Sequence, residues 1–149
     1  MYENTNLTKA DLLQYWFDEI WSKGNLDVID EMLGPETIAN GLIPSFSLLP
    51  ADYHDLVLAL RSLVKDINVG FTHTLEQDDW IAVRTVINGN RADNDKPIQI
   101  FGQIFVRFDG QRLAEIYSHV NFFSLFEQLG QLPPDALPIC LTGQRLQWT

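Results

Sequence analysis

The sequence predicts an α+β domain in which helices come first and a hairpin-connected sheet follows. Apolar residues recur at helical spacing in the first third of the chain, and the pattern then alternates at every second residue after Asp66. Turn residues at 77–79, 88–96 and 109–110 separate the alternating segments, and a short apolar segment ends at Gly130. Helices grouped apart from consecutive strands are typical of the α+β class.

Composition limits the possible partners and location. The 149 residues are 46% hydrophobic and 20% charged, which is enough for one domain with a single core. The net charge of −10 argues against nucleic acid and anionic membranes, because both require a surplus of Lys and Arg. Residues 1–6 lack a signal-peptide pattern, and Cys140 is the single cysteine. We therefore expect a cytoplasmic protein with no nucleic-acid or membrane partner.

The first helix is predicted from a capping pattern and an apolar stripe. Thr8 and Asp11 form a capping-box-like start, and Gly24 marks the end. The stripe between them consists of Leu12, Leu13, Trp16, Phe17, Ile20 and Trp21. Trp16 and Phe17 fit either of two interpretations, because large aromatic side chains serve as core or as the floor of a cavity for a flat ligand.

Two further helices and a short strand are predicted before residue 66. Asn25 begins a short helix that Gly34-Pro35 ends, and Thr37–Pro44 reads as a strand broken by glycine and proline. A third helix follows Asp52, with His54 exposed in its first turn. Its buried stripe is Leu56, Val57, Leu60, Leu63 and Val64.

The next three predicted strands contain three candidate site residues. His73 falls on the same predicted face as Ile67, Val69, Phe71 and Leu75. It is therefore either a buried, hydrogen-bonded histidine or an imidazole that lines a pocket together with Phe71. Trp80–Asn88 and Pro97–Asp109 follow as strands, and Gln103 lies between two phenylalanines, where it could donate a hydrogen bond to a ligand.

The last strand has an unusual polar face. One predicted face consists of Leu113, Glu115, Tyr117, His119 and Asn121, and the other of Ala114, Ile116, Ser118 and Val120. The polar set is chemically varied, so we interpret it as a pocket wall, with an ordinary solvated face as the alternative. The small apolar face is typical of packing. Residues 122–130 then predict a short helix with glycine at its end.

The end of this segment carries a motif that resembles a known family. Its residues are Glu115-x-Tyr117-x-x-x-Asn121-x-x-x-Leu125-x-x-Gln128-Leu129-Gly130. They resemble the closing motif of the SnoaL-like polyketide cyclases, in the nuclear transport factor 2-like or ketosteroid-isomerase-like superfamily. Tyr117 stands where the family usually has Trp, and Asn121 stands where the cyclases have their catalytic Asp. Asn40 occupies a place where the superfamily often has a cavity-lining His, although Asn40-Gly41 is also a strong turn pair.

The resemblance implies a specific architecture. It is a cone-shaped α+β barrel, with a strongly curved antiparallel sheet closed by three N-terminal helices and a short C-terminal helix. A single domain would span residues 1–149, with its core at about 8–130 and an extension at 131–149. Pro133, Pro134 and Pro138 argue against a helix in this extension, which could cover the cavity mouth or a partner subunit. Family members are commonly homodimers through the outer sheet face, so we expect a homodimer.

The available residues favour acid–base chemistry without a metal or cofactor. The histidines lack metal-ligand spacing, and the sequence has no phosphate-binding loop. An amide such as Asn121 cannot accept a proton at neutral pH, so another base is required. His119 is the first candidate and His73 the second; Glu115 is a third, unless it pairs with Arg107 or Arg112. The remaining possibility is a pocket that binds without catalysis.

The resulting hypothesis is a small-molecule enzyme with a hydrophobic pocket, of the cyclase, isomerase or hydro-lyase type. His119 or His73 would act as the base, and Asn121 would act with Tyr117 and Gln103 as donors. The predicted substrate-binding residues are Tyr117, Asn40, Gln103, Trp16, Phe17, Phe71 and Glu115. The alternative is a non-catalytic small-molecule-binding or dimeric interaction domain on the same fold, and a protein-binding adaptor is a third possibility.

Overall fold

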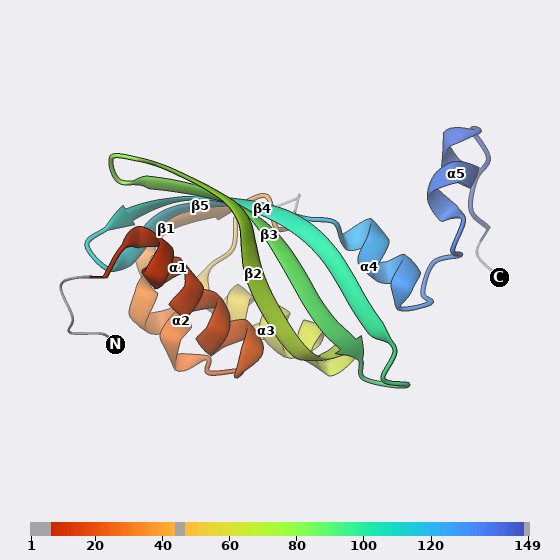
Figure 1. The fold of residues 1–149 in the computed structure, drawn as a ribbon, viewed down its shortest axis with the longest axis horizontal. Helices are drawn as coiled ribbons and strands as arrows, with labels where there is room; N and C mark the ends of the chain where they lie inside the picture. The colour runs from red at the N-terminus through yellow and green to blue at the C-terminus, as the bar shows by residue number, and fades with distance from the viewer. Residues whose placement is uncertain (1–6, 44–46, 148–149) are drawn as a thin grey trace.

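The computed structural model describes residues 7–43 and 47–147. Residues 1–6, 44–46 and 148–149 lie outside the described residues, and they include Pro44 at the end of the predicted strand Thr37–Pro44. A sheet of five strands is covered on one face by helices, as Figure 1 shows. The strands are β1 (Leu33–Asn40), β2 (Val64–Gln77), β3 (Trp80–Arg91), β4 (Pro97–Asp109) and β5 (Arg112–Val120). The helices are α1 (Lys9–Trp16), the π-helical η1 (Phe17–Ser22), α2 (Asp27–Met32), α3 (Pro50–Leu63), α4 (Phe122–Gln128) and α5 (Ala136–Leu141).

The first helix begins as its sequence predicts. The Thr8 hydroxyl accepts from the Asp11 backbone N–H at 3.0 Å, and the Thr8 N–H donates back to the Asp11 carboxylate at 3.1 Å. The predicted stripe is largely buried, and Trp16 is only 2% exposed. The helix continues as the π-helical η1, which ends at Ser22, and Gly24 follows two residues later with a φ of +76° that suits glycine. The sequence pattern did not predict the π-helical segment.

The sheet confirms the predicted α+β class and corrects two details. Its strand order is β1-β5-β4-β3-β2, with β1 parallel to β5 and the other neighbours antiparallel. The sheet is therefore mixed rather than purely antiparallel. Its edges, β1 and β2, do not pair with each other, so the curved sheet stays open instead of closing as a barrel. Helices α1 to α3 cover its concave face (Figure 1).

Register shifts in two strands decide which side chains face the helices. On β5, Leu113 pairs with Phe108 and Glu115 pairs with Arg107, so Ala114 is an extra residue relative to β4. Leu113 and Ile116 are both buried as a result, and the strict alternation predicted for this strand is wrong. An extra residue in one strand moves every later side chain to the opposite face.

A similar shift in β2 overturns the predicted environment of His73. Phe71 pairs with Thr85, whereas His73 pairs with Arg84, so β2 has one more residue than β3 at this point. Thr85 is buried and Arg84 is exposed. His73 is therefore exposed on the outer face with Arg84, instead of sharing a buried face with Val69 and Phe71.

The C-terminal extension contains a helix that the sequence analysis excluded. Helix α5 includes Pro138 as its third residue. A proline in the first turn destabilises a helix little, because the first backbone N–H groups have no intrahelical partner that the proline could remove. Figure 1 shows α5 standing apart from the sheet and the other helices. Within residues 7–43 and 47–147, no helix is long and apolar enough to cross a membrane.

Candidate ligand cavity between the helices and the sheet

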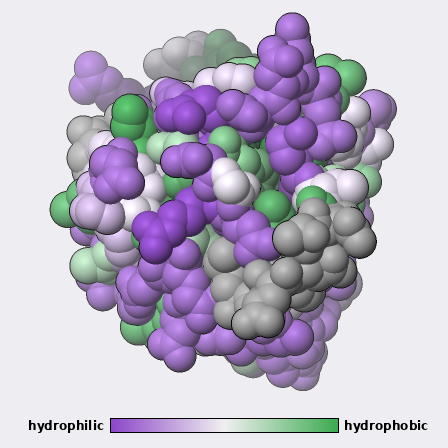
Figure 2. All heavy atoms as spheres, turned by 90° about the vertical axis from the view of Figure 1, so that its left-hand side faces the viewer, coloured by the Kyte–Doolittle hydropathy of each residue, from purple (hydrophilic) through white to green (hydrophobic). Residues whose placement is uncertain are grey.

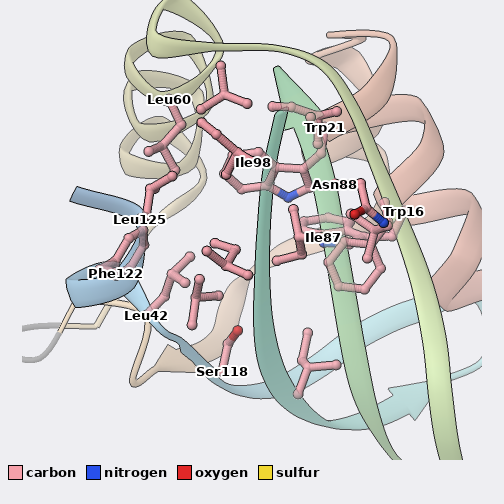
Figure 3. A pocket seen from close by; sticks show the side chains of 18 of the residues that line it. Trp16, Trp21, Leu42, Leu60, Ile87, Asn88, Ile98, Ser118, Phe122 and Leu125 are labelled. Carbon is pink, nitrogen blue, oxygen red and sulfur yellow. The ribbon is translucent and has the colours of Figure 1, made fainter. Parts of the chain in front are cut away.

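A cavity lies between the concave face of the sheet and the helices that cover it. It leaves about 90 Å³ of space, several times what one water molecule needs. Its wall, most of which is drawn in Figure 3, consists of Trp16, Phe17, Trp21, Leu42, Tyr53, Leu60, Val64, Ile67, Val69, Ile87, Asn88, Gly89, Ile98, Ile100, Ile104, Ser118, Val120, Phe122 and Leu125. Most of these side chains are apolar, as is common for small-molecule sites.

The first helical segment supplies the aromatic part of the wall. Trp16 and Phe17 are adjacent in sequence, and both line the cavity. The ring of Trp16 meets that of Tyr53 edge to face, with 5.6 Å between the ring centroids. Phe17 meets Phe71 in the same way at 6.0 Å, and Phe71 supports Phe17 without lining the cavity itself. Such contacts hold the rings at fixed orientations.

Few polar groups reach the cavity. Ser118 is 8% exposed, and Figure 3 shows its hydroxyl oxygen directed toward the enclosed space. Tyr53 is 3% exposed, and burial raises the pKa of its phenol above the usual range. Tyr53 therefore stays protonated at neutral pH and can donate a hydrogen bond but cannot serve as a base. Asn88 also lines the cavity, while its side-chain oxygen accepts from Gln99 at 2.9 Å.

The described cavity wall offers no ordinary acid–base group. Among the described residues that line it, none is Asp, Glu, His, Lys or Arg. A proton acceptor for chemistry at neutral pH would therefore have to come from elsewhere. No group of three or more potential metal ligands comes together within residues 7–43 and 47–147.

Most of the polar residues predicted for the site lie together, but on the opposite face of the sheet. His73, Arg84, Gln103 and His119 form one row, because each pairs with the next across β2, β3, β4 and β5. The adjacent row on this face runs through Leu75, Ala82, Phe105, Tyr117 and Asn40. Neighbouring strands are about 4.8 Å apart, so each row forms a continuous strip.

These rows surround a second depression, which we call the outer hollow. It has a volume of about 410 Å³ and is lined by His73, Leu75, Ala82, Val83, Arg84, Gln103, Ile104, Phe105, Tyr117 and His119. The structure thus brings four predicted site residues together around one depression. It separates them from Trp16 and Phe17, which line the inner cavity. The catalytic roles of His73 and His119 remain predictions.

Glu115 takes part in a hydrogen-bonded cluster on the outer face. The Arg107 guanidinium donates to its carboxylate, and the Tyr117 hydroxyl donates to the other carboxylate oxygen at 2.7 Å. This is the pairing with Arg107 that the sequence allowed as an alternative. Arg107, and then Tyr117, hold the pKa of Glu115 below its usual range. A lowered pKa makes Glu115 a weaker base than an ordinary carboxylate.

Asn121 lies at a helix terminus. Its side-chain oxygen accepts from the Ser124 backbone N–H at 3.0 Å, which makes it the N-cap of α4. The backbone N–H of Asn121 donates to the backbone carbonyl of Phe101 at 3.1 Å. Asn121 lines neither the inner cavity nor the outer hollow. Its predicted donor role toward a substrate has no support from this position.

The Gln-Leu-Gly end of the motif fastens α4 to β4. The Gln128 side chain accepts from the Gln99 N–H at 3.1 Å and donates to the Gln99 carbonyl at 2.9 Å. Gly130 follows with a φ of +74°, a conformation that favours glycine after a helix. This part of the motif therefore has a structural function, because it holds Phe122 and Leu125 against the cavity.

Sequence reasoning missed several residues of the inner cavity. Ser118 and Val120 belong to the small apolar face that we interpreted as ordinary packing, and this face is the one that lines the cavity. Tyr53 was not assigned to the third helical stripe, although it lies four residues before Val57 on the same side of α3. The spacing of Tyr53 was a usable signal, whereas the role of Ser118 depended on a strand register that sequence does not reveal.

The fold and the position of the cavity define a class of protein. An open, curved sheet covered on one face by helices is the ketosteroid isomerase-like fold, which is also that of a similar protein from Catenulispora acidiphila. The chain belongs to the SnoaL-like polyketide cyclase family, whose model matches residues 11–129. This match confirms the predicted family. No curated protein shows a matching sequence.

Solved structures agree with this fold. A proposed polyketide cyclase from Acidithiobacillus ferrooxidans is 22% identical, with 86% of this chain and 99% of that chain covered and a TM-score of 0.69. A proposed polyketide cyclase from Bacillus cereus is 17% identical over 87% and 89% of the two chains, with a TM-score of 0.72. TsrD from Streptomyces laurentii is 15% identical over 85% and 100%, with a TM-score of 0.66. At these identities the likeness establishes the fold alone.

Proposed function

We propose that this protein binds an uncharged, largely apolar small molecule in the inner cavity. The supporting observation is the wall itself, in which aromatic and aliphatic side chains surround a space that is several water molecules in size. An ionised ligand is disfavoured because the described wall offers no opposite charge to offset its loss of hydration. Because the family is named for polyketide cyclases, carbonyl-rich polyketides are the first class of ligand to examine.

The polar groups of the cavity fit the recognition of a ligand carbonyl. The Ser118 hydroxyl can donate a hydrogen bond, and the protonated Tyr53 phenol can donate another from α3. Two donors inside an apolar enclosure orient a ligand more than they contribute to its affinity. The same donors would stabilise negative charge that develops on a carbonyl oxygen, as cyclase or isomerase chemistry requires.

A titration with Prodan, an uncharged naphthyl ketone whose emission responds to polarity, tests the binding proposal. Energy transfer from tryptophan would report that Prodan is bound, and the variants would show whether it lies in the cavity. We expect saturable binding to the wild type, and at least about tenfold weaker binding to Ser118→Leu, whose larger side chain occupies the cavity. Ser62→Leu makes the same change on an exposed surface of α3 and serves as the control. Equal binding by the two variants would contradict the proposal.

The predicted acid–base chemistry is tested separately. His73 and His119 lie at the outer hollow, so in the described structure neither imidazole lines the inner cavity. Any turnover of a polyketide-type substrate by the wild type would be compared with that by His119→Ala and His73→Ala. Retained turnover in both variants would exclude these residues as the base, while leaving ligand binding in the cavity untouched.

A further inference from the structure

We propose that Arg61 is a positioning residue of the inner cavity. It fixes the end of η1 and thereby holds Trp21 in the part of the wall through which a ligand enters and leaves. Trp21 lies in the last turn of η1, and Leu60 directly precedes Arg61 on α3; both line the cavity. This inference rests on the proposed function, because it concerns the exchange of a ligand at the same cavity.

Trp21 and Leu60 form the partly exposed portion of the wall that the first helices supply. Trp16 and Tyr53, which belong to the same portion, are only 2% and 3% exposed. Figure 3 shows Trp21 and Leu60 on the side of the cavity away from Ser118. Side chains that touch both the cavity and solvent lie on a short path between them. An apolar ligand therefore has a direct route past Trp21 and Leu60.

The end of the molecule at which α1 begins is less suited to the entry of an apolar ligand. Figure 2 shows that this end is mostly hydrophilic, with small and separate hydrophobic spots. An apolar molecule gains little by leaving water for such a surface, because the gain is roughly proportional to the apolar area that becomes buried. The route past Trp21 and Leu60 is therefore the more favourable of the two.

Arg61 fastens the end of η1 to α3. Its Nη1 group donates to the Trp21 carbonyl at 2.6 Å and to the Ser22 carbonyl at 2.9 Å. The last carbonyls of a helix lack partners within it, so a cation that donates to two of them satisfies both and complements the helix dipole. The guanidinium also lies against Gly24, where an added Cβ would be 2.8 Å from the Arg61 Nε atom. One side chain thus ties the backbone of Trp21 to α3.

The end of η1 needs this tie because its own structure is unfavourable. A π-helical segment is rare in proteins and occurs most often at functional sites. The Ser22 hydroxyl is buried and has no hydrogen-bond partner among the described residues, which destabilises this end further. Without Arg61, the last turn of η1 would populate other arrangements, and Trp21 would move with it. Arg61 therefore sets how often the wall opens beside Leu60.

The rate at which Prodan leaves the cavity tests this role. Rapid dilution of the Prodan complex, followed through the emission of Prodan, gives the dissociation rate constant. Arg61→Met removes both donated hydrogen bonds and should raise this constant at least about tenfold. Arg61→Lys keeps a cation that can donate to the same carbonyls, so it should restore most of the wild-type rate. Arg112→Met makes the same change on an exposed residue of β5 and should release Prodan as the wild type does.

A second variant tests the wall itself. Trp21→Leu leaves the bonds from Arg61 in place, because they go to backbone carbonyls, but it removes the large side chain. It should also raise the dissociation rate constant of Prodan. Release at the wild-type rate from Trp21→Leu would overturn the proposal, even if Arg61→Met did not fold. The same rate in a folded Arg61→Met variant would overturn it as well.

Fluorine NMR of fluorotryptophan-labelled protein separates a displaced Trp21 from a general loss of stability. Trp21→Phe identifies the signal of Trp21. In Arg61→Met this signal should shift or broaden, while that of Trp80, which stacks on Phe105, stays unchanged. An unchanged Trp21 signal would contradict the positioning role. A wild type that does not bind Prodan would instead contradict the proposed function, and the fluorine signals would still decide whether Arg61 holds Trp21.

Discussion

The link between α4 and β4 through Gln128 offers a quantitative test of how the cavity is held closed. The Gln128 side chain makes three hydrogen bonds: one accepted from the Gln99 N–H at 3.1 Å, and two donated at 2.9 Å to the Gln99 carbonyl and the Ser124 hydroxyl. Gln128→Glu keeps the size of the side chain and the accepted bond. It removes both donated bonds and places a carboxylate against a carbonyl oxygen.

The expected cost follows from these bonds. A hydrogen bond of this kind contributes about 0.5–1.5 kcal/mol, so losing two should lower the free energy of unfolding by about 1–3 kcal/mol. The carboxylate is disfavoured in the folded state, which raises its folded pKa above the unfolded value. The destabilisation due to ionisation should therefore be full above the raised folded pKa, should shrink as the pH falls through that value, and should be absent below the unfolded glutamate pKa of about 4.3.

Urea unfolding followed by tryptophan fluorescence measures this effect. Gln131→Glu adds the same charge three residues later, on an exposed side chain, and should change the unfolding midpoint little. If Gln128→Glu were no less stable than Gln131→Glu at pH 7, the proposed link between α4 and β4 would be wrong. A deficit that stayed constant down to acid pH would also contradict the reasoning, because protonation should restore a donor at this position.

Two further predictions address other parts of the structure. Thr8→Ala removes the cap of α1 and should lower the free energy of unfolding by about 0.5–2 kcal/mol in urea titrations, whereas an unchanged midpoint would contradict the capping role. Arg107 and Tyr117 lower the folded pKa of Glu115, so the wild type should be more stable than Glu115→Gln above the unfolded carboxyl pKa. That advantage should disappear as the pH falls through the lowered folded pKa. Melting curves of both proteins from pH 7 to pH 3 measure it, and a stability difference that does not decline would contradict the prediction.

The sequence predicted local structure well where one segment determines it. Thr8 and Asp11 indicated the first helix, because both partners of the cap lie within one turn. The alternation of side chains predicted after Asp66 was also correct on β4. Ile100 and Ile104 are buried there, whereas Gln103 is exposed on the opposite face. In these places the pattern of each segment agrees with its final surroundings.

The errors arose where the structure depends on a neighbouring strand. The extra residue Ala114 is visible only against β4, and the shift before His73 only against β3. Each shift exchanges the two faces of a strand, so the sequence could not show that the polar residues predicted for a pocket wall lie on the outer face, away from Trp16 and Phe17. The parallel pairing of β1 with β5 joins segments far apart in the chain, and no local pattern indicates it.

The most direct test of the inner-cavity proposal compares both faces of the sheet in one experiment. Methyl-labelled protein would be titrated with Prodan and followed by NMR. Ile104 borders both depressions, so the informative probes are Val69 and Ile100 for the cavity and Leu75 for the outer hollow. We predict saturable shifts of the Val69 and Ile100 methyl signals while those of Leu75 stay unchanged. Shifts at Leu75 with none at Val69 and Ile100 would contradict ligand binding in the inner cavity.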